Sequence, residues 1–395
     1  GARRVRTRCA ECPGEPFARE AWSVLQCSAG PLVPPPRASF VGVSSPPRDV
    51  LLVTSQHNNH GLFAQVERVL NQLHLAGARG LVPHVFLGRK AFASPTSCEV
   101  GENQYFDAAA GPNVWEYYFE PVSSYRGGNA SLDGRPVRLL AVSDEDARRH
   151  AIWSDKDAVT SYFEFNRYDD QLHAVRTRVR RQGARLVNEW LRVRPPLLAE
   201  AAALLAPWRR RSSHLLGVHL RGTDKVTHPK IPLQKFFTYI DAYTKRHSDA
   251  LIVLCTDDQS YHAAVIERYG AARVVSRGAG YATKNVVRDA TIPPQRKGHD
   301  AVLDALLLAH TDFLLKGTSS LSEFALWYNP DLITEHLDLQ IAGAAADAPA
   351  YRALVPTWAG GPREPASEGA GAASWAARQD ARMRALGGGA AAAPP

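Results

Sequence analysis

Short apolar runs and amphipathic segments alternate along the chain. Asp49–Thr54 is an apolar run of strand length, and Val82–Leu87 is a second one. Between them, from Gly61 to Leu75, apolar residues recur on one helical face. This order predicts a β-loop-α-β unit, the repeating element of α/β folds.

A longer alternation follows between about Trp208 and Leu339. Strand-like and helix-like segments take turns there as in βαβ units, which predicts a parallel sheet covered by helices. The predicted fold class is therefore α/β, with two Rossmann-like domains built on parallel sheets. The strands are predicted at 215–220, 251–255, 273–276 and 313–315, and the helices at 233–247, 261–269, 299–310 and 320–328.

The region between these two units is predicted to be less regular. Residues 94–143 are loop-rich and aromatic. Within them, Asn113–Pro121 is interpreted as core packing around an irregular insertion, with a ligand-facing aromatic wall as the alternative. From Ala158 to about Leu205 the pattern is largely helical, and the basic stretch from Arg176 to Arg185 is expected to be a solvated helix face.

The composition changes sharply at both ends of the chain. Residues 1–47 are rich in Arg and Pro, which predicts an extended stem or cap. Residues 341–395 are rich in Ala, Gly and Pro, and we expect them to be disordered. The predicted boundaries are an N-terminal α/β domain with a helical segment over 48–205 and a C-terminal Rossmann-like domain over 206–340.

The bulk composition restricts the function only loosely. The chain has 395 residues, 45% of them hydrophobic and 22% charged, which is ordinary for a globular protein of two or three domains. The net charge of +8 favours anionic ligands. Nucleic acid is not an expected partner, because no zinc-finger, helix-turn-helix or RNA-binding aromatic motif accompanies the charge. No apolar run approaches the ~20 residues that span a bilayer.

For a secreted domain, the cysteines favour disulfides over a zinc or redox site. Cys9 and Cys12 form a CxxC pair, but a zinc site needs a second close pair and a redox pair normally opens a helix after a strand. We expect one or two disulfides among Cys9, Cys12, Cys27 and Cys98, and a buried free thiol at Cys255. Asn129–Ser131 is an N-glycosylation sequon, which supports a secretory location weakly.

Ionisable residues follow directly on the strand predicted at Leu215–Leu220. They are His219, Arg221, Asp224 and Lys225. In open α/β sheets, ligands bind outside the carboxyl ends of the strands. The two cations suit a phosphate or diphosphate, which Arg can hold through two hydrogen bonds. A surface ion pair at a strand end is the alternative.

Two helix starts are candidates for binding the same anion. Ser319 and Ser320 lie where a predicted strand turns into a helix, so that hydroxyls, backbone N–H groups and the positive helix end would form a phosphate cradle. N-capping of the helix is the alternative, and both roles are compatible. Gly61 begins the first helix and would bring a second set of N–H groups.

Three segments, in order, resemble the α1,6-fucosyltransferases, which include core fucosyltransferases and bacterial nodulation fucosyltransferases. His219–Lys225 is similar to their His-x-Arg-Arg-Thr-Asp-Lys motif. Gly298–Ser320 resembles a region in which an Asp on a helix precedes an Ala-Asp-Phe-Leu strand and a Ser-Ser turn. Asn58–Gln65 is similar to a glycine-containing loop near the donor diphosphate. Protein O-fucosyltransferases are more distantly similar.

The resemblance implies a GT-B architecture, with two Rossmann-like domains facing a cleft, and GDP-fucose as the donor substrate. Asp304 would accept hydrogen bonds from guanine, with His219 nearby. Arg221 would stabilise the charge that develops on the departing β-phosphate. No metal and no further cofactor are expected, because protein cations and helix ends replace the metal. The donor site implied as a whole comprises Gly61, His219, Arg221, Asp224, Lys225, Asp304, Ser319 and Ser320. The acidic triplets at 144–146 and 155–157 match an Asp-x-Asp metal motif but follow no convincing buried strand.

The sequence departs from the family at two positions. Gly222 replaces the second Arg of the motif, which leaves the linkage and the sugar open. The Glu that the animal enzymes carry a few residues further on is missing. His228 is the nearest candidate for the catalytic base, and a bystander loop histidine is the alternative.

The expected function is inverting, metal-independent transfer of fucose from GDP-fucose to a glycan or glycoprotein acceptor. A related GT-B enzyme with another nucleotide sugar, or a protein O-fucosyltransferase, is the first alternative. A nucleotide-sugar-binding protein without turnover is the second. The expected location is the Golgi or another secretory lumen, in a type II membrane protein whose N-terminal anchor lies outside this chain.

Overall fold

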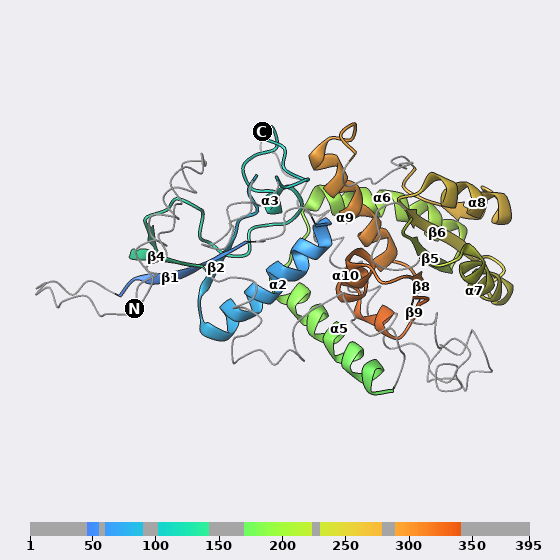
Figure 1. The fold of residues 1–395 in the computed structure, drawn as a ribbon, viewed down its shortest axis with the longest axis horizontal. Helices are drawn as coiled ribbons and strands as arrows, with labels where there is room; N and C mark the ends of the chain where they lie inside the picture. The colour runs from blue at the N-terminus through green and yellow to red at the C-terminus, as the bar shows by residue number, and fades with distance from the viewer. Residues whose placement is uncertain are drawn as a thin grey trace, which may run out of the picture.

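The computed structural model describes residues 46–54, 60–89, 102–141, 170–222, 230–278 and 289–340. In these ranges the chain forms an α/β protein with two sheets rich in parallel strands, as predicted. The smaller sheet lies at one end of the long axis and the larger sheet at the other, with helices α2, α5 and α10 between them (Figure 1). Among the described helices, none is long and apolar enough to cross a membrane.

The N-terminal sheet has the strand order β2-β1-β4-β3. Its central strand β1 (Arg48–Val53) pairs in parallel with both β2 (Val82–Val85) and β4 (Arg135–Ala141), and helix α2 (Leu62–Arg79) connects β1 to β2. The short strand β3 (Ser131–Leu132) forms an antiparallel hairpin with β4. The predicted β-loop-α-β unit is therefore confirmed.

Residues 102–130 are loop-rich, as predicted for 94–143, but strand β4 at the end of this region was not predicted. Its described residues are half-buried or exposed, and it opens with Arg135 and Pro136. The backbone pairing with β1 holds the strand in place, and an apolar pattern does not reveal such pairing. Helix α3 (Trp115–Tyr118) lies in the same region. Trp115, Tyr118 and Phe119 are buried there, which confirms that the aromatic segment packs into the core.

The C-terminal sheet consists of five parallel strands in the order β7-β6-β5-β8-β9. Numbered from the first, this is the order 3-2-1-4-5, in which the direction of winding reverses between β5 and β8. The predicted parallel sheet is thus confirmed. The strands are β5 (Leu215–Leu220), β6 (Leu251–Thr256), β7 (Val274–Val275), β8 (Phe313–Lys316) and β9 (His336–Asp338).

Helices cover both faces of this sheet because its strands are apolar on both sides. Leu216, Val218 and Leu220 pack into one core with α7 (Leu233–Arg246) and α8 (Gln259–Tyr269). The opposite face lies against α9 (Pro294–Ala309) and α10 (Ser320–Tyr328), and the 3-10 helix η2 (Pro330–Ile333) follows α10. Helix α9 begins five residues earlier than predicted, with a proline in its first turn.

Two helices connect the sheets. The predicted helical region from 158 to 205 is divided at 191–194 into α5 (Asp170–Trp190) and α6 (Pro195–Arg211), and its first residues lie outside the described ranges. Helix α5 packs against α10 and α2, and α6 packs against α9. One hydrophobic core therefore extends from β1 to β6. The domain boundary near residue 205 stays a prediction.

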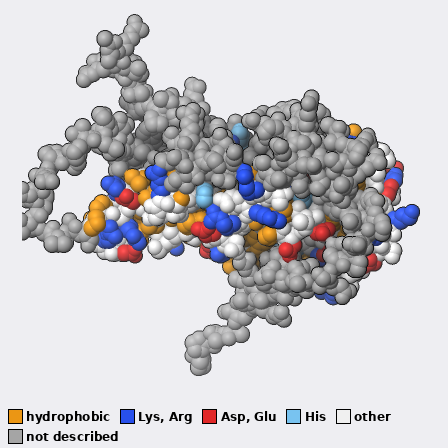
Figure 2. All heavy atoms as spheres, turned by 90° about the horizontal axis from the view of Figure 1, so that it is seen from below, with side chains coloured by type: hydrophobic (Ala, Val, Ile, Leu, Met, Phe, Trp, Pro, Cys, Tyr) orange, Lys and Arg blue, Asp and Glu red, His pale blue; other side chains and the backbone are white. Residues whose placement is uncertain are grey.

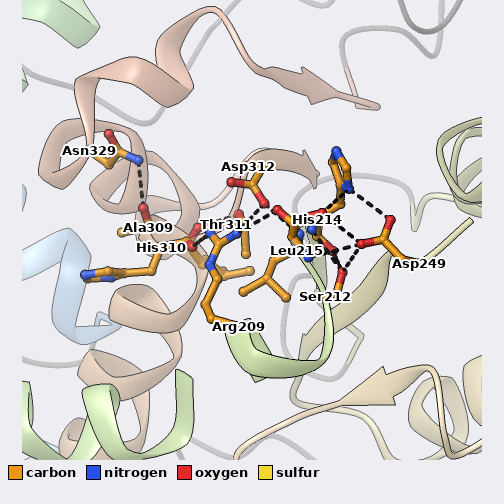
Figure 3. Close-up of polar contacts among 12 residues, drawn as sticks. Arg209, Ser212, His214, Leu215, Asp249, Ala309, His310, Thr311, Asp312 and Asn329 are labelled. Carbon is orange, nitrogen blue, oxygen red and sulfur yellow. Dashed lines mark hydrogen bonds and ion pairs between the residues drawn. The ribbon is translucent and has the colours of Figure 1, made fainter. Parts of the chain in front are cut away.

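The amino end of the C-terminal sheet is tied together by carboxylates (Figure 3). Asp312, just before β8, accepts hydrogen bonds from the backbone N–H of Leu215 and from Arg209 at the end of α6, both at 2.6 Å. Asp249 accepts from Ser213 and lies 3.0 Å from the His214 ring nitrogen. Asp312, which belongs to the fucosyltransferase-like segment, therefore has a structural role at the edge opposite the strand ends where ligands bind.

Candidate functional site

The reversal of strand order between β5 and β8 places the candidate site. Helix α7 follows β5 onto one face of the sheet, and α10 follows β8 onto the other. Such divergence opens a crevice outside the carboxyl ends of the two strands. Arg221 directly follows β5, and Thr318 to Ser320 follow β8. The structure thus brings the predicted cation and the predicted serine turn to the same end of neighbouring strands.

A cavity lies at this point, with an empty volume of about 430 Å³, part of it open to solvent. Arg221 and Thr318 both line it, together with Tyr261 and Gln340. Lys230, shortly before α7, is a second cation in its wall. Sequence analysis missed Lys230 as a site residue, although its place between the motif and the next helix is a usable signal. Two cations in one wall suit an anionic ligand.

The N-terminus of α10 follows directly on Thr318, although Ser319 and Ser320 are not among the residues that line the cavity. Ser319 occupies the N-cap position with an extended backbone, but its side chain makes no capping hydrogen bond among the described residues. Side-chain capping, the alternative role for this serine, is therefore not what the structure has. The Ser320 hydroxyl lies 3.4 Å from Glu67 of α2. The helix start accordingly joins the two halves of the molecule.

His219 lies in a row of side chains near the carboxyl end of the sheet. It is in register with Cys255 of β6 and with Lys316 of β8, and all three are buried. The Cys255 thiol, free as predicted, lies 3.7 Å from the backbone oxygen of Asp304 on α9. Residues in register point to the same face of a parallel sheet. His219 and Asp304 are therefore on the same side, as the resemblance implies.

Asp304 is bound by an arginine that sequence analysis did not identify. Arg277, shortly after β7, donates from Nε to Oδ1 of Asp304 at 2.8 Å and lies 3.0 Å from Asp300, one turn earlier on α9. The expected common face of Asp300 and Asp304 is confirmed. Burial raises the pKa of Asp304 to about 6, although the Arg277 charge opposes this shift.

A buried cluster of four charges lies beneath the serine turn. Arg180 of α5 donates two hydrogen bonds to Glu323 of α10, at 2.8 and 2.9 Å. Lys316 donates to Glu323 at 2.9 Å and to Asp338 of β9 at 2.8 Å. All four side chains are at most 4% exposed. Despite burial, Arg180 and Lys316 hold the pKa of Glu323 well below its usual range.

This cluster corrects the interpretation of the basic stretch in α5 as a solvated face. Arg178, Arg181 and Arg185 are exposed, but Arg180 is buried. A signal was present, because Arg180 stands four residues before Ala184 and seven before Val187, on the buried side of the helix. The apolar face thus indicates that Arg180 is buried, but the sequence does not identify its partner, Glu323, which is 143 positions away.

The cluster also holds two residues of the cavity wall. Asp338 accepts from the Thr318 hydroxyl at 3.4 Å through the same oxygen that binds Lys316. Its other oxygen accepts from the backbone N–H of Gln340 at 3.1 Å. Charged hydrogen bonds of this kind restrict the positions of their partners. Two cavity-lining residues are therefore positioned by one buried carboxylate.

Gly222 explains one departure from the fucosyltransferase motif. A Cβ atom at this position would lie 2.6 Å from the side chain of Asp258, which is too close for any side chain. The Gly222 N–H donates to Asp257 at 2.7 Å, so the backbone is held against the end of β6. An arginine at position 222 would require Asp258 to move.

Gly61 is the N-cap residue of α2, as predicted for the helix start, but nothing in its surroundings requires a glycine. Its φ of −56° is accessible to any residue, and a Cβ atom would lie 3.9 Å from the Tyr105 hydroxyl. That hydroxyl accepts from the Leu62 N–H at 2.8 Å. One N–H group of this helix start therefore already has a protein partner. The role of Gly61 in anion binding stays a prediction.

Several predicted residues lie outside the described ranges. They are Asp224, Lys225 and His228 of the motif loop, the acidic triplets at 144–146 and 155–157, and Cys9, Cys12, Cys27 and Cys98. Their proposed roles stay predictions. Charged side chains of both signs lie next to each other on the face seen in Figure 2, so the positive net charge is not gathered into one patch on its described part.

The sheet order and the cations at its reversal define a Rossmann-like α/β protein with a candidate phosphate site.

No protein-family description matches the chain, and no curated protein does. Among solved structures, the chain is similar to the fucosyltransferase NodZ from Bradyrhizobium, with a TM-score of 0.36 and 16% identity over 71% of this chain and 92% of that one. NodZ α-1,6-fucosyltransferase soaked with GDP-fucose is similar at 16% identity and a TM-score of 0.36, over 72% of this chain and 93% of that one. A point variant of Arabidopsis thaliana FUT1 in complex with GDP is similar at 9% identity and a TM-score of 0.37, over 80% and 74%.

Proposed function

We propose that the protein transfers fucose from GDP-fucose to a glycan or glycoprotein acceptor, with inversion and without a metal ion. The single observation that carries this proposal is the common cavity of Arg221 and Thr318 at the reversal between β5 and β8. The motif resemblance of the same two segments supports fucose as the sugar. The positive N-terminus of α10 begins directly beside Thr318.

The donor would bind with its diphosphate at the cavity and its base toward α9. Arg221 would hold the β-phosphate through two charge-assisted hydrogen bonds, and Lys230 would add a second positive charge. Ser319 and Ser320 would offer hydroxyls and backbone N–H groups to the same phosphates. Asp304 of α9, which lies on the same side of the sheet as His219, would accept hydrogen bonds from the guanine edge.

In the reaction, an acceptor hydroxyl oxygen attacks the anomeric carbon as the bond from that carbon to the β-phosphate oxygen breaks. The electron pair of this bond stays on the phosphate, so negative charge increases beside Arg221. The acceptor proton must pass to a base within hydrogen-bonding distance. His228 is the proposed base. The reversed anomeric configuration of the product follows from the single displacement.

The test measures GDP release and fucose transfer by the purified chain with GDP-fucose, with and without EDTA. We expect turnover that EDTA does not change, and loss of at least about a hundredfold in Arg221→Ala, in the range of removing one transition-state donor. Arg210→Ala, which removes an exposed arginine from α6, is the matched control and should retain full activity. Activity retained in Arg221→Ala would contradict the assignment of the diphosphate site.

A further inference from the structure

We propose that Arg277 determines the base specificity of the site, by keeping Asp304 ionised and oriented so that it accepts two hydrogen bonds from guanine. This inference rests on the proposed function and extends it to a residue that touches no substrate. Arg277 acts through Asp304 and is therefore a positioning residue.

The geometry fixes Arg277 from two sides. Its side chain is 10% exposed, and two of its nitrogens bind two carboxylates on α9, Nε with Asp304 and Nη1 with Asp300. Asp300 also pairs with Arg296, whose Nε lies 2.7 Å from Oδ1 of Asp300 and whose side chain is 51% exposed. The guanidinium thus lies between two acidic residues one helical turn apart. The bond to Asp304 uses Oδ1 and does not use the second oxygen, Oδ2.

The chemistry of the bases makes the charge of this carboxyl decisive. Guanine presents two neighbouring donors, N1–H and the exocyclic amine, and an ionised carboxylate accepts from both. A protonated carboxyl offers one donor and one acceptor, which matches the amine and ring nitrogen of adenine instead. Hypoxanthine lacks the exocyclic amine and so loses one of the two bonds. The protonation state of Asp304 therefore selects the base.

The surroundings of Asp304 make its ionisation depend on Arg277. Burial is the largest influence on the pKa of Asp304 and raises it, Arg277 lowers it, and Asp300 raises it, with a net pKa of about 6. The Cys255 thiol contacts the same residue from β6. Beyond these, His299 bridges Asp300 to Glu200 of α6. Among the described residues that contact Asp304, Arg277 is the positive charge, so its removal leaves burial unopposed.

The test is calorimetric titration of the full chain with GDP, IDP and ADP at several pH values. The wild type should prefer GDP over IDP by roughly tenfold or more at pH 7.5, the worth of one hydrogen bond to a buried charge. The preference should decline as the pH falls through about 6, where Asp304 takes up a proton. In Arg277→Gln the preference for GDP over IDP should shrink to about threefold or less. Arg277→Lys keeps the positive charge and should retain most of the preference.

Controls separate this role from a general loss of structure. Arg296→Gln removes an arginine from the same network, but one that contacts Asp300 and not Asp304, and should leave the preference within about twofold. Pyrophosphate, which would use Arg221 and not Asp304, should bind Arg277→Gln as tightly as the wild type.

The outcomes distinguish the two proposals. A wild type that does not prefer GDP over IDP would remove the basis of the inference and contradict the proposed function. A wild type that prefers GDP, with the same preference in a folded Arg277→Gln, would overturn the inference alone. If Arg277→Gln does not fold, the wild-type pH profile decides, because a preference that stays constant from pH 7.5 to pH 5 also overturns it.

Discussion

Replacing Glu323 by Gln should destabilise the protein strongly while hardly changing its shape. The Glu323 side chain is fully buried and accepts three hydrogen bonds, two from Arg180 and one from Lys316. The amide keeps the size of the side chain but loses its charge. Two buried cations then face only the carboxylate of Asp338. Breaking such a network from one side costs about 3–5 kcal/mol of unfolding free energy.

That cost is a large part of the total stability, which is typically about 5–15 kcal/mol. Urea unfolding followed by circular dichroism should show a midpoint lowered by roughly 1–2 M, since the slope for a protein of this size is a few kcal/mol per molar. Glu189→Gln on the exposed face of α5 removes a carboxylate that is 44% exposed and pairs with Arg185. This control should cost about 0.5 kcal/mol or less.

A charge-balanced variant tests the reasoning more sharply. Arg180→Met combined with Glu323→Met removes one cation and one anion and leaves the pair of Lys316 and Asp338 intact. Apolar replacement of a buried ion pair is often nearly neutral, so the double variant should be more stable than Glu323→Gln. The reasoning is refuted if Glu323→Gln costs less than about 1 kcal/mol, or if the double variant is the less stable of the two.

The pH dependence of the same cluster has a definite sign. The folded pKa of Glu323 is held below its unfolded value by Arg180 and Lys316. Its contribution to stability is therefore present above pH 4.5 and is lost as the pH falls below that value. Acid titration of the wild type should show this loss, and Glu323→Gln should lack it.

Two further predictions concern other positions. Gly222→Ala should weaken GDP binding by at least about tenfold, because its Cβ atom would meet Asp258 at 2.6 Å and displace the backbone beside Arg221; wild-type affinity would contradict this steric account. Asp312→Ala should lower the unfolding free energy by about 1–3 kcal/mol, since the buried N–H of Leu215 loses its acceptor. The affinity for GDP should stay unchanged, because Asp312 lies at the amino end of the sheet, opposite the candidate site (Figure 3). A change in affinity without loss of stability would show that Asp312 acts on the site.

The prediction from sequence was most accurate where strands are buried on both faces. All six residues of β5 are buried, as are all six of β6, so both stand out as apolar runs. Strand β4 was missed because its exposed and half-buried residues give no such run. Only its parallel pairing with β1, between segments about 90 positions apart, makes it a strand.

The candidate site divides in the same way. Arg221 was predicted because it directly follows a strand, and Ser319 because it lies where a strand turns into a helix; the topology then placed both at one reversal point. Arg277 was not predicted, since an arginine in a loop has the same appearance in sequence whether it meets water or a carboxylate. The loop with Asp224, Lys225 and His228 lies outside the described residues, so those assignments rest on sequence alone.

The sequence by itself determined the α/β class, most of the C-terminal strands and helices, and the residues that end β5 and begin α10. Those features depend on local patterns, in which apolar periodicity and the residues at a strand end are neighbours in the chain. The tertiary structure alone decided that Arg180 is buried, that Arg277 holds Asp304, and that Asp338 positions the cavity wall. The stability of a buried charged group depends on the hydration it loses and on partners from distant segments. Only the folded chain brings those partners together.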